Sequence, residues 1–187
     1  VPAGFSVPAS FGTTTVAPNS ATTFQVRLDA VSAGAFSGTV QFANRDADEN
    51  PFNFTISGSV TKPEIQVSVG GSNVADGTGA VHFGTTEVGS PVTKTFTISN
   101  TGTANLTLTP PISVPAGFSV PASFGTTTVA PNSATTFQVR LDASTVGIFS
   151  GTVQFTNNDA DEGTFTFTVT GTVELAERRV YLPLVSK

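Results

Sequence analysis

A stretch of thirty residues occurs twice in this chain, and the duplication constrains the fold more than any other feature. Val1–Ala30 returns unchanged at Val114–Ala143, and a more divergent copy continues to Val60 and Val173. The offset of 113 residues is too long for one repeat of a solenoid and has the size of a whole domain. The 187 residues therefore predict one complete unit and the second half of another.

The repeat divides the chain into four parts. We expect residues 1–60 to be the C-terminal half of a sandwich unit, which needs complementation by further strands. Residues 64–173 form a complete unit, and residues 174–187 form a C-terminal tail with a short apolar strand. Residues 61–63 are the linker, which Pro63 stiffens. Because the linker is so short, we expect adjacent units to keep a fairly fixed end-to-end relation.

Apolar and polar side chains alternate with a period of two, which predicts an all-β fold. In the first half-unit the clearest strand candidates are Thr22–Leu28, Phe36–Phe42 and Phe52–Val60, where Phe and Val alternate with Thr, Ser and Gln. Turns rich in Pro, Gly, Asn and Asp separate them, and no segment has helical spacing over more than a turn. The complete unit contains seven to eight such strands, which is typical of an antiparallel β-sandwich.

A fainter repeat inside the complete unit leads to an expectation about the two sheets. Phe83–Val88 followed by Phe96–Ile98 is similar to Phe124–Val129 followed by Phe137–Val139. Each pair predicts a short strand, a turn and a long strand. We expect two such hairpin-like units to face each other and supply the two sheets.

Several motifs of the complete unit resemble one known family. They are His82–Ser90 (HFGTTEVGS), Thr95–Gly102 (TFTISNTG), Leu106–Leu108 (LTL), Asn158–Glu162 (NDADE) and Thr170–Thr172 (TGT). These motifs are similar to those of Hydin-type (ASH) immunoglobulin-like domains and, among bacterial proteins, to the "choice-of-anchor D" group. The resemblance covers residues 64–173 fully and residues 1–60 in part. It implies a non-catalytic immunoglobulin-like sandwich, usually repeated in large secreted or surface proteins.

Composition excludes several classes of function. The net charge is −5, and the eight Lys and Arg residues are spread along the chain, which argues against nucleic acid or anionic membranes as partners. There is no Cys for disulfides or thiolate metal sites, and no apolar run long enough to predict a membrane-spanning segment. Because there is no signal peptide and no initial Met, we expect a processed form or a fragment of a longer protein.

Candidates for catalysis or modification are few. His82 is the only His, and nothing around it supplies a nucleophile elbow or an oxyanion loop, so we expect an ordinary strand residue. We therefore predict that the protein is not an enzyme and assign no catalytic, cofactor-binding or metal residues and no cofactor. Asn53 and Asn105 fit the pattern of N-glycosylation acceptors and are expected to face solvent, which leaves their modification open.

Two acidic turns are the best functional candidates by residue type. Asp46–Glu49 lies within the turn Asn44–Asn50, and its copy Asp159–Glu162 lies within Asn157–Gly163. Carboxylates are the hard oxygen ligands that calcium prefers, but the spacing is not that of an EF-hand loop. Asp and Asn are also common in turns, because they hydrogen-bond their own backbone. We favour solvated turns and leave calcium binding open.

The half-unit carries the functional prediction. By itself it would expose an apolar sheet face and unpaired strand edges, so either its front half lies upstream in a longer precursor or another chain fills the gap. An apolar run in the tail is a candidate for partial filling by strand addition and hence for an assembly interface. Its residues are Val180, Tyr181, Leu182, Leu184 and Val185.

We predict a non-catalytic structural module of an extracellular or cell-surface bacterial repeat protein. It would act as a stalk, spacer or filament subunit through head-to-tail packing of sandwiches and strand complementation. The expected partners are further copies in a homo-oligomer or filament, or adjacent repeats of the same precursor. The alternative is an adhesion domain whose loops recognise a surface glycan or protein, although Tyr181 is the only aromatic residue besides Phe that could stack on a sugar. An enzyme, or an accessory domain cut from one, is a third hypothesis.

Overall fold

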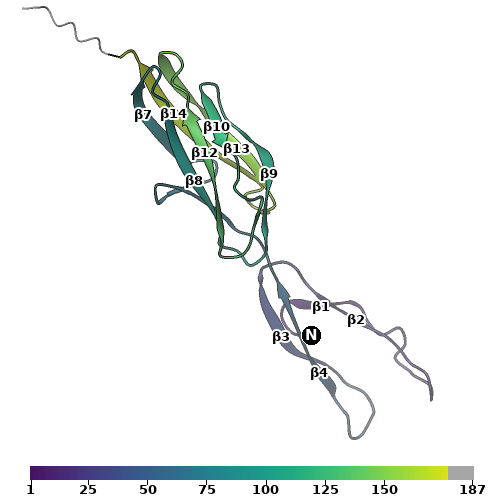
Figure 1. Ribbon diagram of the computed structural model, residues 1–187. Coiled ribbons are helices and arrows are strands. Elements are labelled where there is room, and N and C mark those ends of the chain that lie inside the picture. The colour runs from purple at the N-terminus through teal and green to yellow at the C-terminus, as the bar shows by residue number, and fades with distance from the viewer. Residues whose placement is uncertain (177–187) are drawn as a thin grey trace, which may run out of the picture. The chain divides into compact units, whose positions relative to one another are not determined.

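The computed structural model describes residues 1–176, and every regular element in them is a β-strand (Figure 1). The chain separates into a first unit, Val1–Thr61, and a second unit that begins at Lys62. No helix of the described residues is long and apolar enough to cross a membrane. The prediction of an all-β fold is confirmed.

The first unit consists of two separate antiparallel strand pairs. β1 pairs with β2, and β3 pairs with β4 in an uninterrupted register from Gly34↔Val60 to Phe42↔Phe52. The strands are β1 (Phe5–Ala9), β2 (Gln25–Leu28), β3 (Gly34–Phe42) and β4 (Phe52–Val60).

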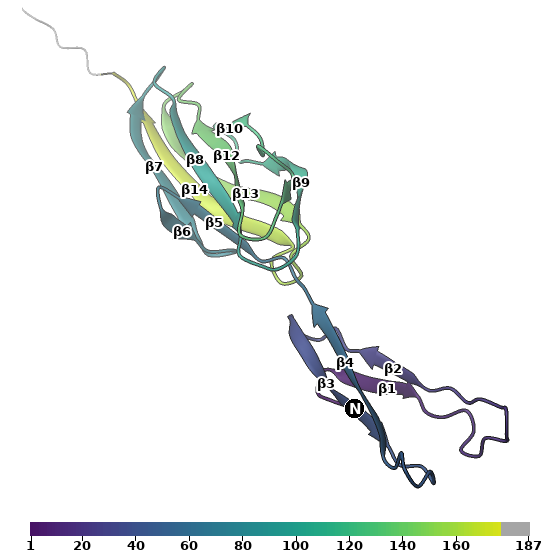
Figure 2. The ribbon, with the colours of Figure 1, turned by 60° about the horizontal axis from the view of Figure 1, so that its bottom comes forward.

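The second unit is a β-sandwich of two five-stranded sheets (Figure 2). One sheet has the order β10-β12-β8-β5-β6 and the other β11-β9-β13-β14-β7. All neighbours are antiparallel except β7 and β14, which run parallel. The strands are β5 (Ile65–Val69), β6 (Ser72–Val74), β7 (Ala80–Glu87), β8 (Val92–Asn100), β9 (Leu106–Ser113), β10 (Phe118–Ala122), β11 (Thr128–Val129), β12 (Ala134–Leu141), β13 (Gly147–Asn157) and β14 (Thr164–Glu174). The predicted sandwich is confirmed, and the short strands β6 and β11 raise the strand number above the predicted seven to eight.

The core of the second unit is rich in phenylalanine. Along β12 and β14 every second side chain is buried, as the alternation predicts. Phe96 stacks on Phe137 with ring centroids 5.0 Å apart, and Phe155 stacks on Phe165 at 5.5 Å. These offset aromatic pairs fill the space between the sheets with large apolar surfaces.

The expectation about the internal repeat was wrong. β7, which carries Phe83, lies in the sheet with β14, whereas β8, which carries Phe96, lies in the opposite sheet. The second copy behaves in the same way, because β11 and β12 also lie in different sheets. Each copy therefore crosses from one sheet to the other instead of forming a hairpin. The alternation of side chains predicts which face of a strand is buried but not which strand lies beside it.

The first unit has the same local geometry as its copy in the second. The register of β1 with β2, including its bulge, is identical to that of β10 with β12. A Cβ atom at Gly58 would lie 2.9 Å from the side chain of Leu28, and one at the equivalent Gly171 would lie 2.6 Å from that of Leu141. A leucine methyl group thus packs closely on the equivalent glycine in both units.

Candidate functional site

The main feature of the first unit is an apolar face whose equivalent in the second unit is buried. Phe165 and Phe167 on β14 are 1% exposed, whereas their counterparts on β4, Phe52 and Phe54, are 39% and 36% exposed. The side-chain types are the same, so the difference comes from what covers them.

The two exposed rings and three half-buried ones form a continuous cluster, which we call the phenylalanine face. Neighbouring ring centroids lie 5.0–6.4 Å apart. Beside it lies a hollow of about 790 Å³ whose lining includes Val16 and several Thr side chains. The residues of the face are Phe11, Phe24, Phe42, Phe52 and Phe54. A contiguous apolar surface of this kind marks a site of association.

In the second unit, the strands that pair with the equivalent strands come from residues 64–113. β8 pairs with β12 over eight residues, β9 pairs with β13, and β7 pairs with β14. In the first unit the counterparts β2, β3 and β4 belong to two-stranded sheets and have no such neighbours. Their free edges and the phenylalanine face together form a surface that can accept strands.

The first acidic turn is a self-contained, exposed loop. Asn44 holds it together, because its Oδ1 accepts from the backbone N–H of Asp46 at 2.8 Å and its Nδ2 donates to the carbonyl of Glu49 at 2.9 Å. The hydrogen bond with the Asp48 side chain lowers the pKa of Asp46. These contacts are those of an ordinary solvated turn, as we favoured from the sequence.

The second acidic turn lies in a different environment. Asp159 is 3% exposed, and its Oδ2 accepts the backbone N–H of Ile65 at 2.8 Å. Burial raises the pKa of Asp159, and Asp161 adds to the rise, while the Ile65 amide opposes it. Asp159, Asp161 and Glu64 bring one carboxylate oxygen each within 4.8 Å of one another. The sequence identified the two aspartates but not Glu64, which lies far away along the chain.

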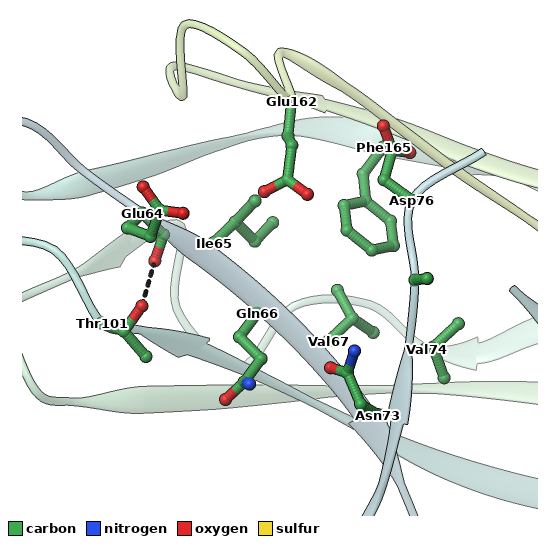
Figure 3. Close-up of a pocket in the computed structure, with 11 residues that line it drawn as sticks. Glu64, Ile65, Gln66, Val67, Asn73, Val74, Asp76, Thr101, Glu162 and Phe165 are labelled. Atoms are coloured by element: carbon green, nitrogen blue, oxygen red, sulfur yellow. Dashed lines mark hydrogen bonds between the residues drawn. The ribbon is translucent and has the colours of Figure 1, made fainter. Parts of the chain in front are cut away.

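Further carboxylates surround a hollow of about 450 Å³ next to this turn. Its lining includes Glu64, Glu162 and Asp76, with apolar side chains of β5 and β6 beside them (Figure 3). Burial raises the pKa of Glu162, and the nearby carboxylate of Asp159 raises it further. Lys62 is the counter-charge, since its Nζ lies 2.5 Å from Glu64 Oε2 and this contact raises the pKa of Lys62. The hollow is therefore strongly acidic.

The other residues singled out in the sequence take no part in these sites. His82 is an exposed residue of β7 whose Nδ1 lies 2.7 Å from the hydroxyl of Thr170. Asn53 and Asn105 are exposed. The apolar tail run Val180–Val185 lies outside the described residues.

Residues 78–172 match the model of the HYDIN/CFA65/VesB-like, Ig-like domain family. The chain belongs to this family. The resemblance inferred from the motifs of the second unit is confirmed, and Ig-like domains of this family are typically non-catalytic. The matched residues lie within the second unit, and the first unit repeats the later part of them.

Solved structures similar to this family member have low sequence identity. A protein of unknown function from Porphyromonas gingivalis W83 is 10% identical, with a TM-score of 0.47 over 92% of this chain and 81% of that one. The ASH/PapD-like domain 7 of human CEP192 is 15% identical, with a TM-score of 0.45 over 62% and 89%. The VesB protease of Vibrio cholerae is 23% identical, with a TM-score of 0.40 over 51% and 30%. No curated protein sequence matches the chain.

Proposed function

We propose that this chain is a non-catalytic structural module of an extracellular or cell-surface bacterial repeat array. In this role, each sandwich is a rigid spacer, and the array forms a stalk or filament. The phenylalanine face of the first unit carries the proposal. Its occupant is a segment equivalent to residues 64–113, contributed by a preceding repeat segment or by another copy of the protein.

Identical sequence supports this choice of occupant. The sequence of β2, Gln25–Leu28, is identical to Gln138–Leu141 of β12, and β12 pairs with β8 in the second unit. A segment like residues 64–113 therefore has the side chains and the strand register to fit the first unit. Full burial of Phe52 and Phe54 would remove roughly 75 Å² of each from water, which stabilises the complex by about 2 kcal/mol per ring before ordering costs. The free edges of β2, β3 and β4 would gain backbone hydrogen bonds as well.

A graft tests this proposal directly. A second copy of residues 62–113 is fused to the N-terminus at Val1, which recreates the junction that Ser113 and Val114 make in the natural sequence. The grafted chain should stay monomeric, bind less of a hydrophobic dye and show two cooperative unfolding transitions. The original chain should bind more dye and associate as its concentration rises, as followed by light scattering and electron microscopy.

A second graft serves as the control. It carries Phe96→Asp and Ile98→Asp in the fused segment, because both side chains are fully buried in the second unit and a carboxylate there prevents packing. This control should behave like the original chain. If the intact graft leaves dye binding and association unchanged, the first unit does not accept strands of this kind and the proposal fails.

The assembly role of the tail stays a prediction from the sequence. If Val180, Tyr181, Leu182, Leu184 and Val185 join one copy to the next, deletion of residues 176–187 should reduce the polymers seen by electron microscopy. Unchanged polymers would contradict a role of the tail and leave the phenylalanine face as the assembly surface.

The alternative proposal is an adhesion domain. It predicts saturable binding of a glycan or surface protein by residues 62–176 as a monomer. The described residues contain neither Trp nor Tyr, so they offer no amphipathic aromatic platform for a sugar ring. An array of glycans and matrix proteins that gives no binding would count against it.

A further inference from the structure

Three carboxylates converge on one point of the second unit. Asp159 and Asp161 come from the turn between β13 and β14, and Glu64 directly precedes β5. One carboxylate oxygen of each lies within 4.8 Å of the other two. Like charges at this separation repel one another, so a further positive charge among them is stabilising.

The hydrogen bonds of Asp159 leave one of its two carboxylate oxygens without a donor. The residue is 3% exposed, and only its Oδ2 has a donor, the N–H of Ile65. Its Oδ1 is buried and makes no hydrogen bond. A buried carboxylate oxygen without a donor is costly, unless a cation coordinates it. Glu64 Oε2 is also buried without a hydrogen bond, although Lys62 Nζ forms an ion pair with it.

We propose that Glu64, Asp159 and Asp161 bind a divalent cation, and that the cation is calcium. All three ligands are hard carboxylate oxygens, and the group contains no nitrogen or sulfur ligand that would favour zinc or copper. Calcium accepts irregular sets of oxygens with water in the remaining positions, whereas magnesium demands a nearly ideal octahedron. The neighbouring carboxylates of Glu162 and Asp76 increase the attraction for a cation (Figure 3).

One ion pair already reaches this cluster, between Lys62 and Glu64. Lys62 supplies one positive charge from an exposed side chain, so it neutralises only part of the cluster. A bound cation would compete with Lys62 for Glu64 and would connect the start of the second unit to the turn between β13 and β14.

The first unit contains a natural control for this site. Asp46 and Asp48 are the copies of Asp159 and Asp161, but both are exposed, and residues 1–61 contain no copy of Glu64. Among the described residues, the metal-compatible group contains Asp159 and Asp161 but not their copies. The acidic turn alone therefore does not make the site, and Asp46 and Asp48 should bind no calcium with comparable affinity.

The test is a calcium titration of the full chain by isothermal calorimetry after treatment with a chelator. We expect one site per chain and a rise in the melting temperature of the second unit with calcium that magnesium does not match. Asp161→Asn and Glu64→Gln should each weaken binding at least tenfold, whereas Asp46→Asn together with Asp48→Asn should leave it unchanged. Lys62→Gln should tighten binding, because it removes the competing ammonium group.

Each outcome decides the proposal. Absence of binding heat together with an unchanged melting temperature would overturn it. Binding that resists both Asp161→Asn and Glu64→Gln, or that the paired first-unit variant weakens equally, would assign the ion to another place and would also overturn it. Asp161 and Glu64 are preferred over the buried Asp159 for substitution, and circular dichroism confirms that each variant is folded.

Discussion

Substitution of one phenylalanine in each unit measures how much the missing strands contribute. Phe165 and its copy Phe52 are the same residue at the same strand position, 1% and 39% exposed. Phe165 stacks on Phe155 with an interplanar angle of 14°, and Phe52 lies against Phe42 at a centroid distance of 5.4 Å. The two residues are therefore of the same type and differ mainly in the exposed fraction of the ring.

The expected losses in the free energy of unfolding follow from how much of each ring is buried. Phe165→Ala should destabilise the second unit by about 3–5 kcal/mol, since it removes the apolar surface and leaves a closed cavity. Phe52→Ala removes only the part of the ring that is buried, and on an open face it leaves no closed cavity. About 90 Å² of lost burial corresponds to about 2 kcal/mol in the first unit. With residues 62–113 fused to the N-terminus, the cost of Phe52→Ala should rise to about 3–5 kcal/mol.

The assay is urea unfolding followed by far-ultraviolet circular dichroism, because the chain has no Trp. A chain of residues 62–187 identifies the transition that belongs to the second unit. The reasoning is refuted if Phe52→Ala costs the same with and without the graft. It is also refuted if Phe52→Ala in the original chain costs as much as Phe165→Ala.

Three further predictions concern the second unit. Asn100→Asp should cost about 3–5 kcal/mol in urea unfolding, because the buried Asn100 Nδ2 donates to the carbonyls of Ala104 and Val129 and a carboxylate would leave both without a donor. Gly171→Ala should cost about 1–3 kcal/mol in the same assay, because its new Cβ would meet Leu141 at 2.6 Å. With a chelator present, the melting temperature of the second unit should rise as the pH falls from 7 towards the ordinary Asp pKa of 3.8. The reason is that the raised pKa of Asp159 makes the folded state bind a proton there more readily than the unfolded state does. Asp159→Asn should reduce this rise.

Each of these three predictions has an outcome that would contradict it. Unchanged stability of Asn100→Asp would mean that the two carbonyls have other donors. A neutral Gly171→Ala would mean that the Leu141 side chain can move aside without loss of packing. A melting temperature that falls on mild acidification, or a rise that Asp159→Asn leaves intact, would assign the pH dependence to other groups.

The sequence predicted the fold class and much of the core, because alternation depends only on the period of a strand. Phe137, Phe155, Phe165 and Phe167 follow that period and are all buried. It also predicted Asp159 and Asp161 as candidate oxygen ligands. It did not predict Glu64 beside them or the crossing of β7 and β8 between the sheets, because both depend on which distant segments become neighbours.

The duplicated stretch distinguishes most clearly what the local sequence determines from what the tertiary structure determines. Ala134–Phe137 belongs to β12, where it pairs with β8, whereas the identical Ala21–Phe24 is not a strand. Likewise, Thr128–Val129 forms β11 beside β9, and the identical Thr15–Val16 does not. Local sequence thus determined which side chains can face a core. The tertiary structure decided whether a core exists there, because a strand forms its hydrogen bonds, and buries its phenylalanines, only against a neighbour.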